Sequence, residues 1–202
     1  MDIKLLLSCF VAILALVNPV QKIFVITSLQ SQFTDKELKY LSLKSSLTAF
    51  IILVLFLFLG QVIFNYVFHI QLYAFQVTCG VVLFYNGITG LQKGVFIQVD
   101  QNVKLQDLST VPIAMPMIAG PATITAAVTF PAHYGREITI ISIFLALSIN
   151  LLFMLYSRYI GNILTKLNFM NALIRITGLI VATIGVQMVL TGITNFIVTL
   201  KI

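Results

Sequence analysis

Six long apolar stretches, separated by short polar connections, constrain what this chain can fold into more than any other feature. They lie at about residues 5–29, 46–68, 72–92, 111–130, 138–159 and 173–198. A helix needs about 20 apolar residues to cross the hydrocarbon core of a bilayer. Within lipid, only helices and closed barrels satisfy every backbone polar group. The pattern therefore predicts an all-α integral membrane protein, with residues 1–202 forming a single transmembrane domain of six helices.

The composition excludes a water-soluble globule. Of the 202 residues, 59% are hydrophobic and only 9% are charged, whereas soluble domains carry about 25% charged residues. The net charge of +6 comes from single Lys and Arg residues scattered between the apolar stretches. Because these residues form no basic patch, we expect no nucleic-acid partner. The lipid bilayer is the expected surrounding, and the oligomeric state is left open.

The distribution of Lys and Arg between the connections predicts the orientation. With six spans, one side of the membrane holds Lys4, Arg136 and Lys201. The opposite side holds Lys36, Lys39, Lys44, Lys93, Lys104, Arg158, Lys166 and Arg175. Cytoplasmic loops carry an excess of positive residues, so we expect this second side to be cytoplasmic and both termini to lie outside the cytoplasm.

Three connections carry local signals. Thr34 and Glu37 have the spacing of a capping box, which predicts a helix that starts there and continues into the second apolar stretch. Residues 131–137 are expected to form a short turn. Residues 159–171 are expected to link the last two helices.

All five prolines lie in or beside the first and fourth apolar stretches. Pro19 is near the middle of the first, and Pro121 is at the centre of the fourth. A proline inside a helix removes a hydrogen bond and costs about 3 kcal/mol. In lipid the freed carbonyls find no water, so such a break persists only against protein or a wet cavity. We predict breaks at Asn18-Pro19 and Gly120-Pro121; the alternative is that both prolines merely kink packed helices.

The two breaks belong to an internal repeat. Residues 16–19 align with residues 118–121 at an offset of 102. The third and sixth stretches each carry two glycines seven residues apart, which are expected to permit close helix packing: Gly80 and Gly87, and Gly178 and Gly185. Three spans is an odd number, so the second repeat must be inverted relative to the first. The predicted units are repeat 1 at about 1–92, a linker at 93–110 and repeat 2 at about 111–202.

Inverted repeats with a broken helix at matching positions indicate a transporter with a site at the midplane of the membrane. A half-helix N-terminus suits a carboxylate, and the exposed carbonyls of the preceding half-helix suit an ammonium group. A small zwitterion such as an amino acid fits both ends. The neutral hydrogen-bonding residues near the breaks are Asn18, Gln21, Thr123 and Thr125.

Lys22 is the one ionisable residue well inside a predicted span. Such a group is a functional candidate, because an unpaired charge in the membrane costs several kcal/mol. Two interpretations stay open: Lys22 lines the pocket, or its side chain extends toward the inner interface. No carboxylate lies within a predicted span, which argues against a buried Asp or Glu proton relay.

The leading hypothesis is a carrier that works by alternating access. The alternative is a passive channel or a membrane assembly factor without a transport cycle, but a scaffold gains nothing from paired central breaks. We do not expect an enzyme, because the spans lack an acid, a His cluster and a nucleophile–base arrangement. No metal and no cofactor is expected.

The run of residues 111–124, VPIAMPMIAGPATI, closely resembles the fourth-span signature of the MarC family of bacterial and archaeal membrane proteins. Asn18-Pro19-Val20 resembles its first-span motif, and residues 175–179 look like the start of its sixth span. The resemblance implies a bacterial inner-membrane carrier of two inverted three-helix repeats, for small neutral amino acids such as glycine and alanine. Carried over to matching positions, the substrate region comprises Asn18, Pro19, Ala119, Gly120 and Pro121.

The sequence departs from the family pattern at three positions. The glycine expected after the first proline motif is Gln21, and a further expected proline is Phe24. In the third stretch, Cys79 replaces one of a pair of glycines. These departures predict a milder first break or a narrower pocket than in relatives.

Overall fold

The computed structural model describes residues 2–30, 32–93, 113–114, 117–166 and 170–200, and every regular element in these ranges is helical. Five helical segments are long and apolar enough to cross a membrane: Ile3–Leu29, Asp35–Val67, Leu72–Gln92, Arg136–Leu155 and Asn171–Leu200. The prediction of an all-α, multi-pass membrane protein is therefore confirmed. The predicted fourth span, 111–130, lies partly outside the described residues.

The first apolar stretch is divided into two helices. Helix α1 runs over Ile3–Val17 and helix α2 over Pro19–Leu29. Asn18 lies between them in the left-handed conformation, with φ 53° and ψ 72°. Pro19 occupies the first position of α2, where a missing backbone N–H costs nothing.

The second stretch begins as expected at a capping box. Helix α3 spans Asp35–Val62 and continues as a short π-helix, η1, over Ile63–Val67. The Thr34 hydroxyl accepts a hydrogen bond from the Glu37 backbone N–H, and the Glu37 carboxylate accepts one from the Thr34 N–H at 2.8 Å. The prediction that this helix starts before the apolar stretch is confirmed.

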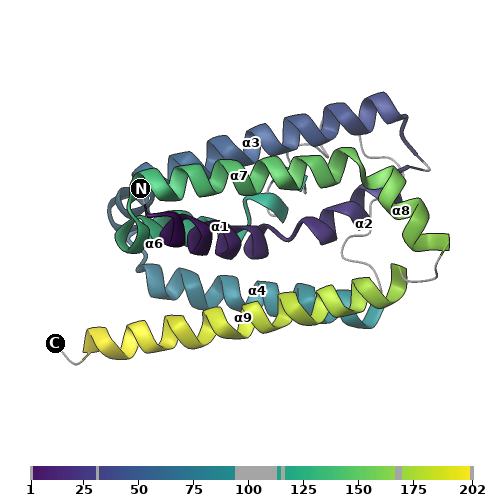
Figure 1. The fold of residues 1–202 in the computed structure, drawn as a ribbon. Helices are drawn as coiled ribbons and strands as arrows, with labels where there is room; N and C mark the ends of the chain where they lie inside the picture. Colours follow the sequence, from purple (N-terminus) through teal and green to yellow (C-terminus); the bar gives the residue numbers. More distant parts are fainter. Residues whose placement is uncertain (1, 31, 94–112, 115–116, 167–169, 201–202) are drawn as a thin grey trace.

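Helices α4, Leu72–Lys93, and α9, Met170–Leu200, form an antiparallel pair along one side of the molecule (Figure 1). A Cβ at Gly80 would lie 2.6 Å from the carbonyl oxygen of Gly185, and one at Gly87 would lie 2.6 Å from that of Gly178. The two backbones therefore touch, as the glycine spacing predicts.

The fourth and fifth stretches differ in detail from the expectation. Helix α6 spans Pro121–Tyr134, so it continues through Pro131, and the predicted turn at 131–137 is confined to Gly135. The positive φ of 84° at Gly135, which glycine adopts without strain, ends α6 and allows helix α7, Arg136–Leu155, to start at once.

The fifth span begins and ends earlier in the sequence than the predicted range 138–159, because α7 spans Arg136–Leu155. The chain leaves helical geometry at Tyr156, and a separate helix, α8, spans Ser157–Lys166 within the expected link. Ser157 and Gly161, one turn apart, are buried, and α8 packs against α2. No Gly or Pro marks the Leu155–Ser157 junction, so the sequence carries no signal for this bend.

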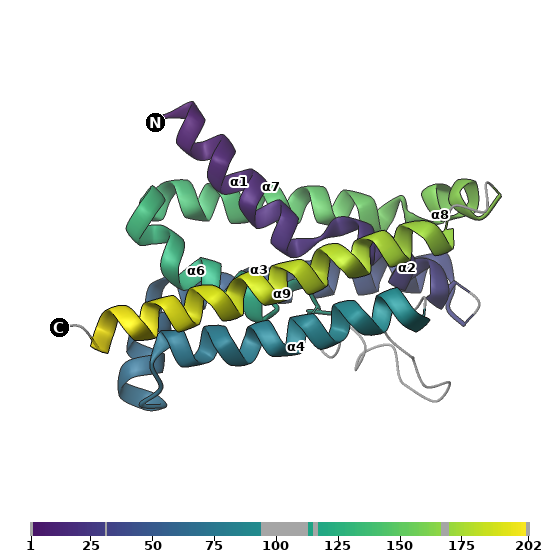
Figure 2. The same ribbon diagram turned by 90° about the horizontal axis from the view of Figure 1, so that it is seen from below.

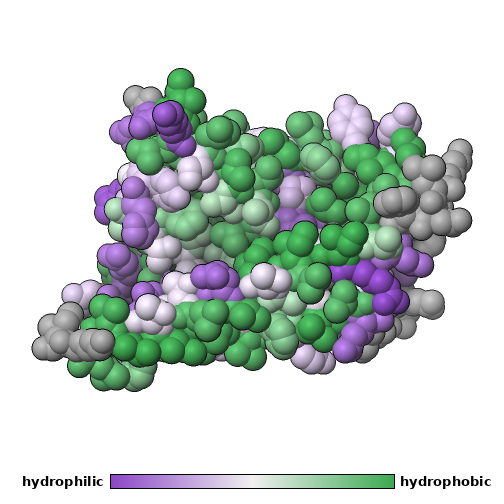
Figure 3. Space-filling view, turned by 60° about the horizontal axis from the view of Figure 1, so that its bottom comes forward, coloured by the Kyte–Doolittle hydropathy of each residue, from purple (hydrophilic) through white to green (hydrophobic). Residues whose placement is uncertain are grey.

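The elements form one elongated bundle. Helix α7 packs against α1, α2, α3 and α6, and the α4–α9 pair contacts the rest through α6, α2 and α8. Both termini lie at one end and α8 at the other in Figures 1 and 2. Hydrophobic side chains cover most of the face seen in Figure 3, with hydrophilic ones gathered toward the two ends.

Gly87→Ala should destabilise the α4–α9 pair. The added Cβ would meet the backbone nitrogen of Ala182 at 2.3 Å, and a backbone atom cannot move aside as a flexible side chain can. We expect a loss of about 1–3 kcal/mol in the free energy of unfolding, measured by thermal melting in detergent. Val81→Leu, on the exposed side of α4, is the control and should melt like the unmodified protein. Equal melting of both variants would contradict the close packing.

Candidate functional site

Asn18 organises the first helix break. Its backbone N–H donates to the carbonyl of Leu14 at 3.0 Å, which completes α1, and its side-chain Oδ1 accepts from the Gln21 backbone N–H at 3.3 Å, which caps α2. Asparagine is among the few residues that adopt the left-handed conformation readily. Its Nδ2 is buried and has no hydrogen-bond partner in the described structure.

Lys22 lies at the same break. Its side chain is only 1% exposed, and its Nζ donates a hydrogen bond to the carbonyl of Val17, the last residue of α1. In an unbroken helix the Gln21 N–H would bond this carbonyl, but here it bonds Asn18 Oδ1 instead. Gln21 Oε1 lies 3.5 Å from the same Nζ. The ammonium therefore points back to the break and not along α2 toward the inner interface.

The second break is bonded differently. Gly120 is extended, with φ −87° and ψ 176°, and Pro121 starts α6. The hydroxyl of Thr123 lies 2.8 Å from the carbonyl of Ile118 and 2.9 Å from that of Gly120, so one donor is shared between two carbonyls at the break. Ala119 is fully buried, and its N–H donates to Ala114 at 2.8 Å.

The predicted site residues thus form two groups. Asn18, Pro19, Gln21 and Lys22 lie together on the α1–α2 side, and the second group covers residues 119–125, the two residues before α6 and the start of that helix. Helices α1 and α6 pack against each other, and residues from both breaks, Val17 and Ala119, belong to the same buried cluster. The second group comprises Ala119, Gly120, Pro121, Thr123 and Thr125.

Several buried polar atoms have no hydrogen-bond partner among the described residues. One is the hydroxyl of Thr125, a predicted site residue. Three more belong to α3 and α7: Ser46, Ser142 and Asn150. These three residues are not among the predicted site residues. An unpartnered polar group in a membrane protein's interior costs free energy. A polar side chain within an apolar stretch is the sequence feature that could have predicted these buried polar groups. Asn150 has this feature clearly, whereas a single serine is only a weak indication.

Asn150 lies on α7, which packs against both α1 and α2. Thr27 of α2 donates a hydrogen bond to the carbonyl of Ser157 at 3.3 Å, and α1–α2 and α7 run in the same direction (Figures 1 and 2). Counting back along both helices at about 1.5 Å per residue brings Asn18 to within about one turn of the level of Asn150. Within the part of the chain that the structure describes, the Asn150 Nδ2 donates a hydrogen bond to the sulfur of Met154, at 3.4 Å.

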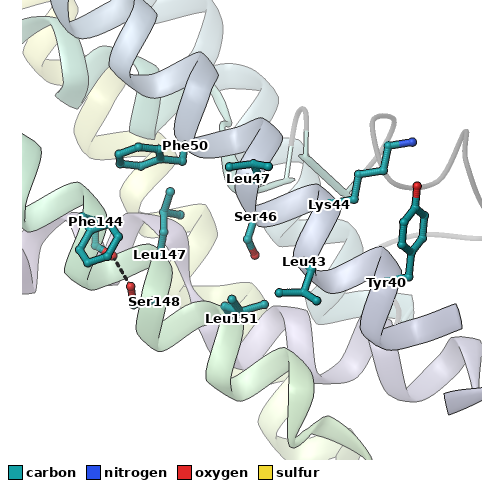
Figure 4. A pocket seen from close by; sticks show the side chains of 10 residues that line it. All are labelled: Tyr40, Leu43, Lys44, Ser46, Leu47, Phe50, Phe144, Leu147, Ser148 and Leu151. Atoms are coloured by element: carbon teal, nitrogen blue, oxygen red, sulfur yellow. Dashed lines mark hydrogen bonds between the residues drawn. The ribbon is translucent and has the colours of Figure 1, made fainter. Parts of the chain in front are cut away.

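A wide cavity lies away from the breaks. Its volume is 490 Å³, and it is a groove between α3 and α7, seen in Figure 4. Leu43, Leu47, Phe50, Phe144 and Leu151 give it an apolar lining. A groove of this composition on the outer surface of a membrane-embedded helix pair suits lipid chains better than a polar solute.

Two smaller cavities have more polar linings. One, of 110 Å³, lies where α2, α3, α7 and α8 meet and includes Gln30, Asp35 and Arg158. The other, of 200 Å³, lies between α3, α6 and the start of α7 and includes Gln61 and Arg136. Neither is lined by the residues of the two breaks.

These features define a multi-pass α-helical membrane protein with interrupted helices and polar groups buried at the interruptions. Residues 3–197 match the model described as "MarC family integral membrane protein". The chain belongs to the MarC family.

Relatives cover nearly the whole chain. "UPF0056 membrane protein PH0214" of Pyrococcus horikoshii is 35% identical over 190 residues, 94% of each chain. "UPF0056 membrane protein YvbG" of Bacillus subtilis is 30% identical over 196 residues, 91% of each chain. A "UPF0056 membrane protein" of Aquifex aeolicus is 28% identical over 203 residues, 96% of this chain and 94% of its own. These names describe membrane proteins and state no enzymatic activity. No solved structure matches the chain.

Thr123→Val should destabilise the second break. Valine keeps the shape of threonine but lacks the hydroxyl, so the carbonyls of Ile118 and Gly120 lose their shared donor. We expect a loss of about 1–3 kcal/mol in the free energy of unfolding, measured by thermal melting in detergent. Thr123→Ser, which keeps the hydroxyl, should retain most of the stability. If valine and serine melt alike, the hydroxyl does not support this break.

Proposed function

We propose that this protein is a carrier of small solutes, most directly small neutral amino acids, that works by alternating access with its substrate between the two helix breaks. The observation that carries the proposal is the first break itself. There, polar groups of Asn18, Gln21 and Lys22 gather inside a membrane-spanning segment, and Asn18 Nδ2 is buried without a partner. A solute that leaves water needs such groups.

The packing of the helices supports two inverted repeats. In repeat 1 the broken helix is α1–α2, followed by α3 and α4; α6, α7 and α9 follow in the same order in repeat 2. Helix α2 packs on α7 and α6 packs on α3, which are equivalent pairs under a two-fold axis, because α2 and α6 both start at the proline of their break. The glycine contacts agree with this symmetry. In the two repeats Gly80 corresponds to Gly178 and Gly87 to Gly185. Gly80 packs against Gly185, and the equivalent contact joins Gly178 to Gly87.

The two polar cavities support alternating access. Helices α2 and α6 start at the two breaks, and each has one of these cavities beside its later residues. Ile26 of α2 lines one cavity, and Val128 of α6 lines the other. These two residues are separated by the repeat offset of 102. A carrier needs one approach to its central site from each side of the membrane, and equivalent cavities at opposite ends meet that need.

The remaining parts of the proposal concern the setting. We place the protein in the bacterial inner membrane with both termini outside the cytoplasm. The α8 end, which carries Lys36, Lys39 and Arg158, then faces the cytoplasm. Asp35 and Arg158 form an ion pair at that end, linking α3 to α8. Both side chains are well exposed, so this pair adds little stability.

Counterflow in liposomes tests the carrier against the alternative of a channel or an assembly factor. Liposomes containing the purified full-length chain and unlabelled glycine or alanine should transiently accumulate the labelled amino acid above its external concentration. A channel only equilibrates the label, and an assembly factor moves none. The carrier proposal fails if no accumulation above equilibrium occurs with either amino acid.

Thr125→Val should lower counterflow by at least about fivefold, because an interaction of about 1–3 kcal/mol with the solute is lost. The hydroxyl of Thr125 is buried and unpartnered. Thr129→Val is the matched control on the same helix, since its hydroxyl is already bonded to the Thr125 carbonyl at 2.9 Å. Thr129→Val should keep counterflow within about twofold. Equal loss in both variants would indicate a general effect on α6 and would remove Thr125 from the site.

A further inference from the structure

We propose that the groove between α3 and α7 binds one anionic phospholipid, whose phosphate contacts the Lys44 ammonium and whose acyl chain lies along the apolar lining. None of the residues that line this groove belongs to the two helix breaks, so the lipid site is separate from the proposed substrate site and does not depend on it. The groove has a polar end, a buried hydroxyl and an apolar remainder, and these follow one another in the order of the parts of a phospholipid.

Lys44 and Tyr40 form the polar end of the groove. They are one turn apart on α3, and the Lys44 Nζ lies 5.8 Å from the centre of the Tyr40 ring. In Figure 4 the Lys44 ammonium and the Tyr40 hydroxyl project away from the apolar lining, at the end opposite to Phe50 and Phe144. A phosphate placed there would meet two groups that donate hydrogen bonds to its oxygens.

The surroundings of Lys44 suit an anionic headgroup. Lys44 lies just before the apolar stretch at about 46–68, and Lys36 and Lys39, both exposed, lie earlier in the same helix. The acidic residues described at this end, Asp35 and Glu37, are bonded to an arginine of α8 and to the cap of α3. Basic pockets between membrane helices bind anionic lipid headgroups, and the local excess of Lys is complementary to such a group.

Ser46 adds a buried hydroxyl one step deeper in the groove. It is only 6% exposed, and its Oγ has no hydrogen-bond partner in the described structure. Ser42 and Ser45 each bond a carbonyl one turn back, at 2.8 and 2.7 Å, whereas the Ser46 hydroxyl points into the space between α3 and α7 in Figure 4. Ser46 is two residues beyond Lys44, about 3 Å along the helix axis. Its hydroxyl therefore lies where the ester carbonyls of a lipid follow the phosphate.

The rest of the lining matches an acyl chain. Leu47 and Leu151 are apolar, and the rings of Phe50 and Phe144, 6.0 Å apart, stand at the far end of the groove. From Lys44 to Phe50 helix α3 rises about 9 Å, which is less than half of a hydrocarbon core about 30 Å thick. The groove therefore stays within one leaflet, and its 490 Å³ accommodates a chain that starts from a phosphate at Lys44.

Quenching of a single tryptophan tests the site. The chain contains no Trp, so Phe50→Trp places one reporter in the groove. The full-length variant is placed in vesicles of equal amounts of phosphatidylglycerol and phosphatidylcholine, with quenching bromines on the chains of one lipid or the other. We expect phosphatidylglycerol to occupy the groove with at least about a fivefold preference, which corresponds to about 1 kcal/mol. Adding Lys44→Met should reduce the preference to within about twofold, whereas Lys4→Met, at an exposed position on α1, is the matched control and should keep it.

A second reporter distinguishes the groove from the general lipid surface. Phe84→Trp, on α4 at a position 43% exposed, should be quenched about equally by the two lipids. An equal preference for phosphatidylglycerol at both reporters would indicate general charge attraction and overturn the proposal. Equal quenching by the two lipids in the groove, or a preference that survives Lys44→Met, would also overturn it. Weaker quenching by both lipids in the groove than at Phe84→Trp would show that a second copy of the chain covers the groove, with the same consequence.

Thermal melting checks the site without a reporter. In an uncharged detergent, phosphatidylglycerol should raise the melting temperature of the unmodified protein more than phosphatidylcholine with the same chains does. The additional rise should vanish in Lys44→Met and persist in Lys4→Met. Equal shifts with the two lipids in the unmodified protein would overturn the proposal even if Phe50→Trp failed to fold.

Discussion

The structure depends on one constraint: inside a bilayer, each backbone N–H and C=O must find a partner within the protein. Continuous helices such as α7 satisfy it by themselves. The two breaks do not, and each is held by side chains. At the first break Asn18 receives a backbone N–H and Lys22 supplies the donor that the Val17 carbonyl lacks. At the second, Thr123 supplies one hydroxyl to two carbonyls.

The helix breaks, with their lost backbone hydrogen bonds, lie in one part of the described bundle. Helices α4 and α9 are unbroken, and their glycines bring the two backbones into contact. That contact leaves no room for a side chain, so this pair resists deformation. The broken helices contact this pair through α6 and α2, and they also pack on α3, α7 and each other, where buried polar side chains are available. The chain thus separates a tightly packed pair from the region that holds unpartnered polar groups.

Much of the fold was predictable because its causes are local in sequence. Apolar length predicts the spans, and the capping box at Thr34 and Glu37 predicts where α3 begins. The spacing of Gly80 and Gly87 predicts close packing. The direction of the Lys22 side chain was not predictable, because it depends on which carbonyl loses its N–H partner at the break. The bend at Tyr156 and the unpartnered Ser46 and Ser142 likewise depend on tertiary packing, and a serine in an apolar stretch is ambiguous by itself.

The two breaks differ in their side chains. At the repeat offset of 102, Asn18 corresponds to Gly120, Gln21 to Thr123, and Lys22 to Ile124. A two-fold arrangement would present two equivalent polar ends, but a buried lysine occurs at one of them and an apolar residue at the other. On the proposed function, a solute bound between the breaks therefore meets different side chains at its two ends, with Asn18, Gln21 and Lys22 at α2 and Thr123 at α6. Because these two sets of side chains differ, the two ends of a site between the breaks are chemically distinct even though the prolines that start α2 and α6 match at the offset of 102.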